Sequence, residues 1–305
     1  MAAAITTADD DDPKHLPGYD ILDVVGHEGL AVVYRARQRS LNRVVVVRTV
    51  RGDACSERVT RCLLREAAFL ARLQHPHVVS ILDWLEHAGR VYLVLEYIEG
   101  GALSTRFAGQ QQQVRPTATL VERLARTLAY IHQRGVVHCN LKPRNVLLAA
   151  SAGSAPEQSE QSSCEEVYGV PLVSGFDVAV DRQRRTDHKE GEILGTPAYM
   201  APEQARGRHQ DIGPATDIYG LGAILYEALT GRPPFQAGTI LDVLKQVMGT
   251  EPESVRGLNP AVDRKLEAIC RKCLHKDPAK RYANGAELAA ALRHFVDGLS
   301  NRRWF

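Results

Sequence analysis

The sequence VVHCNLKPRNVLL, from Val136 to Leu148, sets a group of polar side chains between two apolar runs. Upstream, between residues 19 and 97, short runs rich in Val and Ile are interrupted by one helical stretch at residues 59–74. After Gly100 and Gly101, apolar residues recur at helical spacing over long stretches. These patterns predict a small, mostly antiparallel sheet with one helix, followed by a larger part built mainly of helices.

The chain length leaves room for two modest domains or for one large domain with two lobes. With 305 residues and 44% hydrophobic content, the chain has ample material for a buried core. The two ends of the chain carry little apolar periodicity, and the N-terminal end contains an acidic run. We expect a tail at 1–16, a domain at 17–299 and a second tail at 300–305. The domain would consist of a small lobe at 17–98 and a large lobe at 99–299.

A polar stretch, AASAGSAPEQSEQSSCEE, occupies residues 149–166. Its composition is too polar to build a core, so we expect an insert that is solvated and disordered. The alternative is a linker or docking segment with a role of its own.

Charge and cysteine usage exclude several functional classes. The formal net charge is +2, so nothing in the balance points to nucleic acid or an anionic membrane. The six cysteines are scattered and are expected to be reduced thiols in a cytoplasmic protein. Cys270 and Cys273 lie at helical spacing, which favours two core residues over a metal or redox pair.

No apolar run reaches the length of a membrane span. The final residues, SNRRWF, put two arginines before two aromatic residues. They would suit the cytoplasmic flank of a membrane anchor if a longer parent chain continued after Phe305, but a frayed tail is the simpler interpretation.

Further stretches combine with VVHCNLKPRNVLL into one ordered set. They are GHEGLAVV, VVVR, LVLEYIEGG, VSGFDVA, GTPAYMAPE, ATDIYGLG and KDPAKRY. The set resembles the eukaryotic-type protein kinase fold, and in particular the serine/threonine kinases of bacteria, from about Leu16 to Leu299. The resemblance implies an α+β, bilobal fold with a small antiparallel β lobe that carries one helix, and a large, mainly α-helical lobe.

The phosphate end of the implied nucleotide site departs from the family. In the glycine loop Gly26 is kept, while Glu28 and Ala31 replace the second and third glycines. Glu28 would bring bulk and negative charge to the phosphates, or would instead be solvated on a hairpin tip. Arg48 occupies the position of the lysine that binds the nucleotide phosphates in the family. Glu66 occupies the position of the helix glutamate that pairs with that lysine. Arginine keeps the charge but is longer and planar.

At the adenine end, Val46 replaces a small alanine and would narrow the pocket. Leu95 occupies the position that gates the back of the pocket, and the backbones of Glu96 and Ile98 lie where adenine would hydrogen-bond. The nucleotide-binding positions implied by the resemblance are Gly26, Val33, Val46, Arg48, Glu66, Leu95, Glu96, Ile98 and Leu147.

The catalytic loop has lost its base. Asn140 stands where the family has the Asp that accepts the substrate proton, and an amide has no basic oxygen. Cys139 replaces an arginine that clamps a phosphorylated activation loop in many members. Lys142 and Asn145 remain, the first where the transferred phosphate would be met and the second where Mg²⁺ would be held.

The metal-binding motif is also altered. Gly175, Phe176 and Asp177 stand in place of Asp, Phe and Gly, so the chelating carboxylate is missing from its position. Asp177 lies two residues on, and a register shift would bring it in. That shift would pull Phe176 out of its packing site, so we regard Asp177 as a poor substitute.

The parts that hold the fold together are retained. Glu203 and Arg281 match a buried ion pair, and Asp217 matches the aspartate that ties the large lobe to the catalytic loop. The residues that would form an apolar stack across both lobes are Leu70, Ile81, His138 and Phe176.

These observations favour a pseudokinase, which signals by binding other proteins, an active kinase among them, rather than by phosphorylating them. No cofactor would be required, ATP would bind weakly or not at all, and Mg²⁺ would be held poorly. The first alternative is a weak or unconventional serine/threonine kinase that uses Arg48, Lys142, Asn145 and a displaced Asp177. The second alternative is a switch that responds to nucleotide without catalysis.

Overall fold

The computed structural model describes residues 16–28, 31–50, 57–150, 163–182 and 191–301. Residues 1–15 of the tail expected at 1–16, residues 302–305 of the tail expected at 300–305, and the middle of the insert, 151–162, lie outside the described residues. The chain divides into two compact units. The first comprises the chain up to Gln74 with Val79–Tyr97, and the second comprises His75–Val78 and the chain from Ile98 onward.

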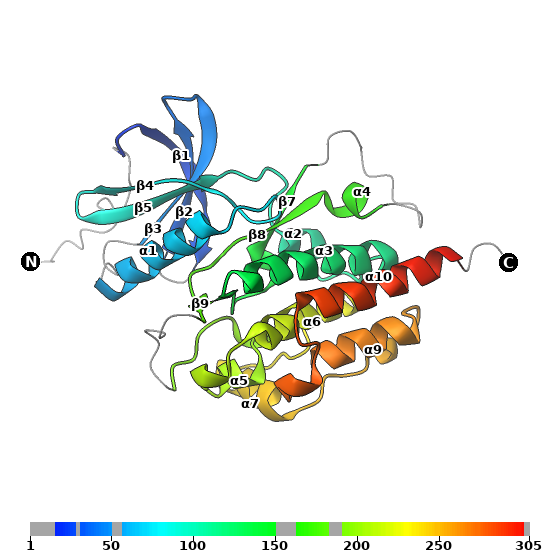
Figure 1. Ribbon diagram of the computed structural model, residues 1–305. Coiled ribbons are helices and arrows are strands. Elements are labelled where there is room, and N and C mark those ends of the chain that lie inside the picture. Colours follow the sequence, from blue (N-terminus) through cyan, green and yellow to red (C-terminus); the bar gives the residue numbers. More distant parts are fainter. Residues whose placement is uncertain (1–15, 29–30, 51–56, 151–162, 183–190, 302–305) are drawn as a thin grey trace, which may run out of the picture. The chain divides into compact units, whose positions relative to one another are not determined.

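The first unit is an antiparallel sheet with one helix, as predicted (Figure 1). Its strands pair in the order β1-β2-β3-β5-β4. Their bounds are β1 Tyr19–Glu28, β2 Ala31–Gln38, β3 Arg43–Val50, β4 Ile81–His87 and β5 Arg90–Glu96, and the helix is α1 Glu57–Arg72.

The alternation of side chains along these strands builds the core of the sheet. Val45 and Val47 on β3 point to one face, where they are fully buried together with Tyr34 and Val94. β-branched residues suit this pleated, buried surface. Leu16 belongs to the same core, so the hydrophobic core of the first unit already includes the last residue of the expected tail 1–16.

The second unit is a helical assembly centred on α6, where almost every residue is buried. α6 packs against α3 and α9, and α10 lies along α3 (Figure 1). A helix that is apolar on all sides needs such a central place. The bounds are α2 Leu103–Phe107, α3 Val114–Gln133, α5 Pro202–Ala205, α6 Pro214–Thr230, α7 Ile240–Gly249, α8 Val255–Leu258, α9 Arg264–Cys273 and α10 Gly285–Asn301.

Cys270 and Cys273 are core residues on α9, as predicted, and both are fully buried. A Cβ on Gly222 of α6 would lie 2.5 Å from the Cβ of Cys273, so glycine is what permits the close approach of the two helices. Burial raises the pKa of the Cys273 thiol to about 12. Both side chains therefore act in packing rather than as thiolates.

Four short strands carry the loops that contain the predicted site residues. β6 Val136–Val137 pairs with β9 Val180–Asp181, and β7 Val146–Ala149 pairs with β8 Val170–Val173. Residues 138–145 connect β6 to β7, and residues 174–179 connect β8 to β9. The two pairings therefore bring these connections together.

The C-terminal end of the polar insert is ordered, which differs from the prediction for 149–166. Residues Cys164–Tyr168 form helix α4, which packs on α3. Ser163 caps it, and the Tyr168 hydroxyl lies 2.9 Å from Thr117 Oγ1. Two buried side chains and a capping box give this short segment enough contacts to fold, although its composition is polar.

Within the described parts of the chain, no helix combines the length and the apolar character needed to cross a bilayer.

Candidate functional site

Arg48 and Glu66 form a buried ion pair in the first unit. Arg48 Nη1 lies 2.7 Å from Glu66 Oε1 and 2.9 Å from Oε2, so one nitrogen spans both carboxylate oxygens. The side chains are only 6% and 1% exposed. β3 supplies the arginine and α1 the glutamate, as the resemblance implied. The pair can hold α1 against the sheet, and its guanidinium takes the place of the family's ammonium group.

The remaining nucleotide-binding positions are divided between the two units. Gly26, Val33, Val46, Leu95 and Glu96 lie in the first unit, and Ile98 and Leu147 lie in the second.

Within the sheet, Val46 and Leu95 are cross-strand partners. Glu96 is hydrogen-bonded twice to Ser80, the residue before β4. The Glu96 N–H donates to Ser80 O at 3.1 Å, and Glu96 Oε1 accepts from Ser80 N at 2.6 Å. The side chain of Glu28 is not among the described parts.

In the second unit, Asp217 fixes the backbone of the catalytic loop. Its carboxylate accepts the N–H groups of His138 and Cys139, each at 2.8 Å, and it also contacts His132 Nε2 at 2.9 Å. Cys139 adopts a φ of +63°, a conformation that costs energy in a residue other than glycine. Asp217 compensates for this strain by accepting the N–H groups of His138 and Cys139, an arrangement that fits the structural role implied by the resemblance.

The Asn140 amide is held by hydrogen bonds on both sides. Its Nδ2 donates to Asp177 Oδ1 at 3.2 Å, and its Oδ1 accepts from Thr196 Oγ1 at 3.3 Å. Lys142 Nζ donates to the same Thr196 oxygen at 2.8 Å. An amide in this position can orient a hydroxyl but cannot take its proton. The motif pattern did not single out Thr196, although it lies in the conspicuous sequence GTPAYMAPE.

Gly175 and Asn145 are in close contact. Gly175 has a φ of +79°, and a Cβ at this position would lie 2.6 Å from Asn145 Nδ2 and 2.7 Å from Asn145 Cγ. Asn145 Nδ2 donates to Asn140 O at 2.8 Å, which fixes the amide there. A side chain at position 175 would therefore need both a strained backbone and a displaced Asn145.

Phe176 keeps the packing site that the resemblance implied. It is fully buried, and its ring centroid lies 4.6 Å from that of His138. His138 Nε2 lies 2.9 Å from Ser174 O, and burial lowers the pKa of this imidazole. Because Phe176 stays in place, Asp177 has not moved into the position of Gly175. The stack that would link these rings to Leu70 and Ile81 of the first unit stays a prediction.

These side chains do not fit the magnesium ion that kinases use. The position of the chelating aspartate has no side chain, and the Asn145 amide donates through Nδ2 to Asn140 O, so Oδ1 is the one neutral oxygen that it can offer a metal. Asp177 is engaged with Asn140. Mg²⁺ prefers octahedral oxygen ligands with carboxylates among them, and this arrangement offers it few.

The structural ion pair predicted at Glu203 and Arg281 is present. Arg281 Nη1 contacts Glu203 Oε1 at 2.8 Å and Nη2 contacts Oε2 at 2.9 Å, with both side chains almost fully buried. Gln204, which the sequence did not single out, links this region to the loop, since its Nε2 donates to Cys139 O at 2.7 Å. A neutral glutamine carries no signal in a motif search, so only the fold could identify it.

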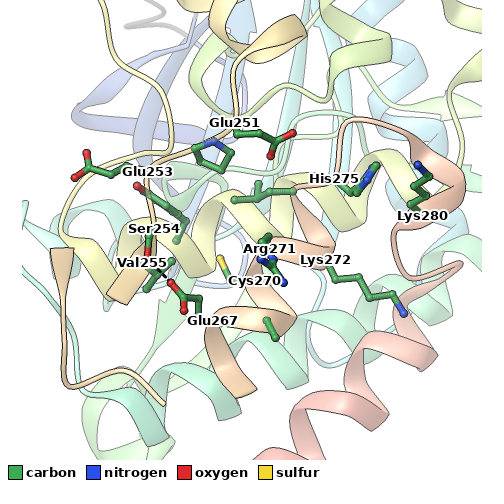
Figure 2. A pocket seen from close by; sticks show the side chains of 14 residues that line it. Glu251, Glu253, Ser254, Val255, Glu267, Cys270, Arg271, Lys272, His275 and Lys280 are labelled. Carbon is green, nitrogen blue, oxygen red and sulfur yellow. Dashed lines mark hydrogen bonds between the residues drawn. The ribbon is translucent and has the colours of Figure 1, made fainter. Parts of the chain in front are cut away.

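A large cavity of the second unit lies away from the predicted site residues. A cavity of about 770 Å³ lies among α6, α9 and the chain before α8, and Figure 2 shows its lining. Ser254 Oγ donates to Glu267 Oε1 across it at 2.6 Å. Acidic and basic side chains both line it, and among the described residues none of the predicted site positions does.

Comparison with known proteins agrees with the fold. The family model described as protein kinase domain matches residues 19–295. Serine/threonine-protein kinase PrkC of Bacillus subtilis is 32% identical over 93% of this chain and 41% of the relative. DNA damage-responsive serine/threonine-protein kinase RqkA of Deinococcus radiodurans is 36% identical over 89% of the chain and 38% of the relative.

Serine/threonine-protein kinase PknB of Mycobacterium tuberculosis is 29% identical over 94% of this chain and 44% of the relative. The chain thus spans about two fifths of the length of the curated relatives that it matches. The family model covers most of the chain, in the same region as the ordered motifs. The chain therefore belongs to the protein kinase family.

Proposed function

We propose that this domain is a pseudokinase, a signalling module that works through binding other proteins and does not transfer phosphate. The observation that carries the proposal is Gly175, which has no side chain at the position of the chelating carboxylate, while the Asn145 amide occupies the space that a Cβ there would need. Asn140 adds to it, because its amide cannot act as the base. Phosphoryl transfer depends on positioning and charge together, so losses at both points compound one another.

The second candidate is a weak or unconventional serine/threonine kinase. The relatives reported above all carry the names of serine/threonine-protein kinases, and these names favour the enzyme over the pseudokinase. The kept residues Lys142 and Asn145 fit this candidate as well. The side chains at positions 140 and 175 argue against it, and on that physical ground we retain the pseudokinase as the proposal.

A thermal unfolding titration with ATP, in the presence and absence of Mg²⁺, separates the candidates. If the dissociation constant exceeds the ATP concentration, stabilisation stays below about 0.5 kcal/mol with or without metal. A clear metal-dependent rise in melting temperature would count against the proposal. An equal rise without metal would instead indicate a switch that responds to nucleotide.

Transfer of labelled phosphate to protein is the direct test. We expect none from the wild-type chain, and none from Asn140→Asp, because Gly175 still leaves the metal without its carboxylate. Transfer by the wild-type chain that disappears in Asp177→Ala would establish the kinase. A kinase-active Asn140→Asp variant would show that the metal site is competent.

A further inference from the structure

The cavity of Figure 2 has two walls of opposite charge. One wall is the segment before α8, which carries Glu251 and Glu253, and the other is α9, which carries Arg271 and Lys272. Figure 2 shows the two glutamates above the cavity and the two cations below it. The acidic and basic groups therefore come from different elements and face the cavity from different sides.

On each wall a charged group remains available. Glu251 and Arg271 form no ion pair among the residues that the structure describes. Glu253 is paired with Arg232 at 2.5 Å. Glu267, the acidic residue of α9 in the cavity lining, is already engaged, because it accepts two hydrogen bonds from the start of α8. The available charges are thus negative before α8 and positive on α9.

Tyr226 of α6 brings a hydroxyl without a partner to the same cavity. The residue is only 1% exposed, and it lines the cavity. Within the described parts of the chain its hydroxyl makes no hydrogen bond, although a buried tyrosine normally finds a partner for this group. Burial raises the pKa of Tyr226 to about 12, so the hydroxyl stays a neutral donor. An acceptor on a bound molecule would satisfy it.

These features define what the cavity can bind. Its occupant must present a cation to Glu251, an anion to Arg271 and an acceptor to Tyr226. An extended peptide meets all three conditions, because successive side chains point to opposite sides and carbonyl groups lie between them. A ligand with charges of one sign only would be repelled by one of the walls. The volume of about 770 Å³ lies within the range of ligand pockets.

We propose that this cavity binds an extended segment of a partner protein in which basic and acidic residues alternate. The basic side chain lies towards Glu251, the acidic one lies towards Arg271, and a backbone carbonyl accepts from the Tyr226 hydroxyl. Exposed ion pairs are weak and screened by salt, so binding should weaken as the ionic strength rises. The site lies apart from the catalytic loop and would serve a kinase and a pseudokinase alike, so it does not rest on the proposed function.

The test is binding of labelled, capped hexapeptides to the full chain, measured by fluorescence anisotropy. The probe is Lys-Glu-Lys-Glu-Lys-Glu, and the control of identical composition is Lys-Lys-Lys-Glu-Glu-Glu. We expect the alternating peptide to bind about fivefold more tightly, since only its neighbouring side chains match both walls. Equal affinity of the two peptides would overturn the proposal. Displacement of the probe by equimolar free lysine and glutamate would also overturn it, because the site would then take small molecules.

Charge reversal at the two walls locates the binding. Glu251→Lys and Arg271→Glu should each weaken binding of the alternating peptide about tenfold. The double variant exchanges the two walls and should regain most of the affinity, because the peptide fits again after a shift of one residue. The matched control is Lys245→Glu, a change of the same size at a 74% exposed position outside the cavity, which should have no effect. A double variant as weak as the single variants would refute the two-wall arrangement.

Tyr226→Phe tests the floor of the cavity. Because the hydroxyl has no partner among the described residues, its removal should leave the melting temperature unchanged and weaken peptide binding about threefold to tenfold. Unchanged affinity would remove the contact with the peptide backbone and overturn the assignment of an extended peptide. Far-ultraviolet circular dichroism confirms that each variant is folded.

Discussion

Two clusters of polar side chains lie within the helical unit, and they differ in the carboxylates that they contain. In the structural cluster, Glu203 and Asp217 are fully engaged, the first with Arg281 and the second with two backbone amides. In the catalytic-loop cluster, amides stand at positions 140 and 145, and position 175 has no side chain at all. The single carboxylate there, Asp177, contacts the Asn140 amide.

The difference separates what the fold needs from what the reaction needs. A buried carboxylate is costly unless it is paired, so those that remain are the ones that hold elements together. Carboxylates that serve only metal binding or proton transfer contribute nothing to the free energy of folding. Under the proposed function the chain does not perform the reaction, and such a chain is free to lose them.

The largest effect should come from breaking the structural cluster. Arg281→Met leaves Glu203 buried without its cation and should lower the free energy of unfolding by about 3 to 5 kcal/mol. The matched control is Arg232→Met, since Arg232 pairs with Glu253 in an exposed position, where we expect a loss of about 0 to 1 kcal/mol. Urea denaturation measures both. Similar losses would remove the distinction between the clusters.

A smaller loss is expected from Gly175→Ala. The new Cβ combines an unfavourable φ with a clash against Asn145, and should cost about 2 to 3 kcal/mol. Gly89 provides the control, because it has a φ of +73° and nothing within 4 Å of an added Cβ. Gly89→Ala should cost only about 1 kcal/mol. If the two variants lose the same stability, Asn145 yields easily and position 175 could accept a carboxylate.

The smallest effect is expected from returning a carboxylate to the catalytic loop. Asn140→Asp places an oxygen anion where Nδ2 now donates to Asp177, and should cost about 1 to 2 kcal/mol at pH 7. The repulsion acts only while both carboxyl groups are ionised, so the cost is present at pH 7 and shrinks as the pH is lowered towards about 4, the ordinary pKa of an aspartate.

Asn140→Ala supplies the uncharged control for this measurement, since it removes the amide without adding charge. Its loss of stability should not shrink in the same way as the pH is lowered. Equal pH dependence of the Asp and Ala variants would show that Asp177 does not sense the new charge.

The fold was readable from the sequence because its signals are regular. Valine-rich runs such as Arg43–Val50 follow the period of a strand, and the motif around Asp217 lies at the start of the apolar helix that buries it. The pairing of Glu203 with Arg281 followed from the motif order, although the two residues are far apart in the chain. These strands, this helix and this ion pair could be predicted because residue type and position in the sequence are enough to indicate them.

Other features depend on distances that no pattern encodes. The missing aspartate at position 175 was evident, but the close contact that a side chain there would make with Asn145 required the backbone geometry. Helix α4 was mistaken for part of a disordered insert because its polar composition conceals two buried side chains. Thr196 and Gln204 carry no charge, so their links to Asn140 and Cys139 were not apparent.

The left-handed backbone at Cys139 has a consequence for how this domain can change. Its shape is held mainly from outside, by the carboxylate of Asp217 on α6, which accepts the Cys139 N–H. The thiol adds a contact with Val137 O and packs beside Val180. The main chain of the loop is therefore anchored by a residue of a distant helix, and a change of catalytic side chain elsewhere in the loop need not disturb that anchor.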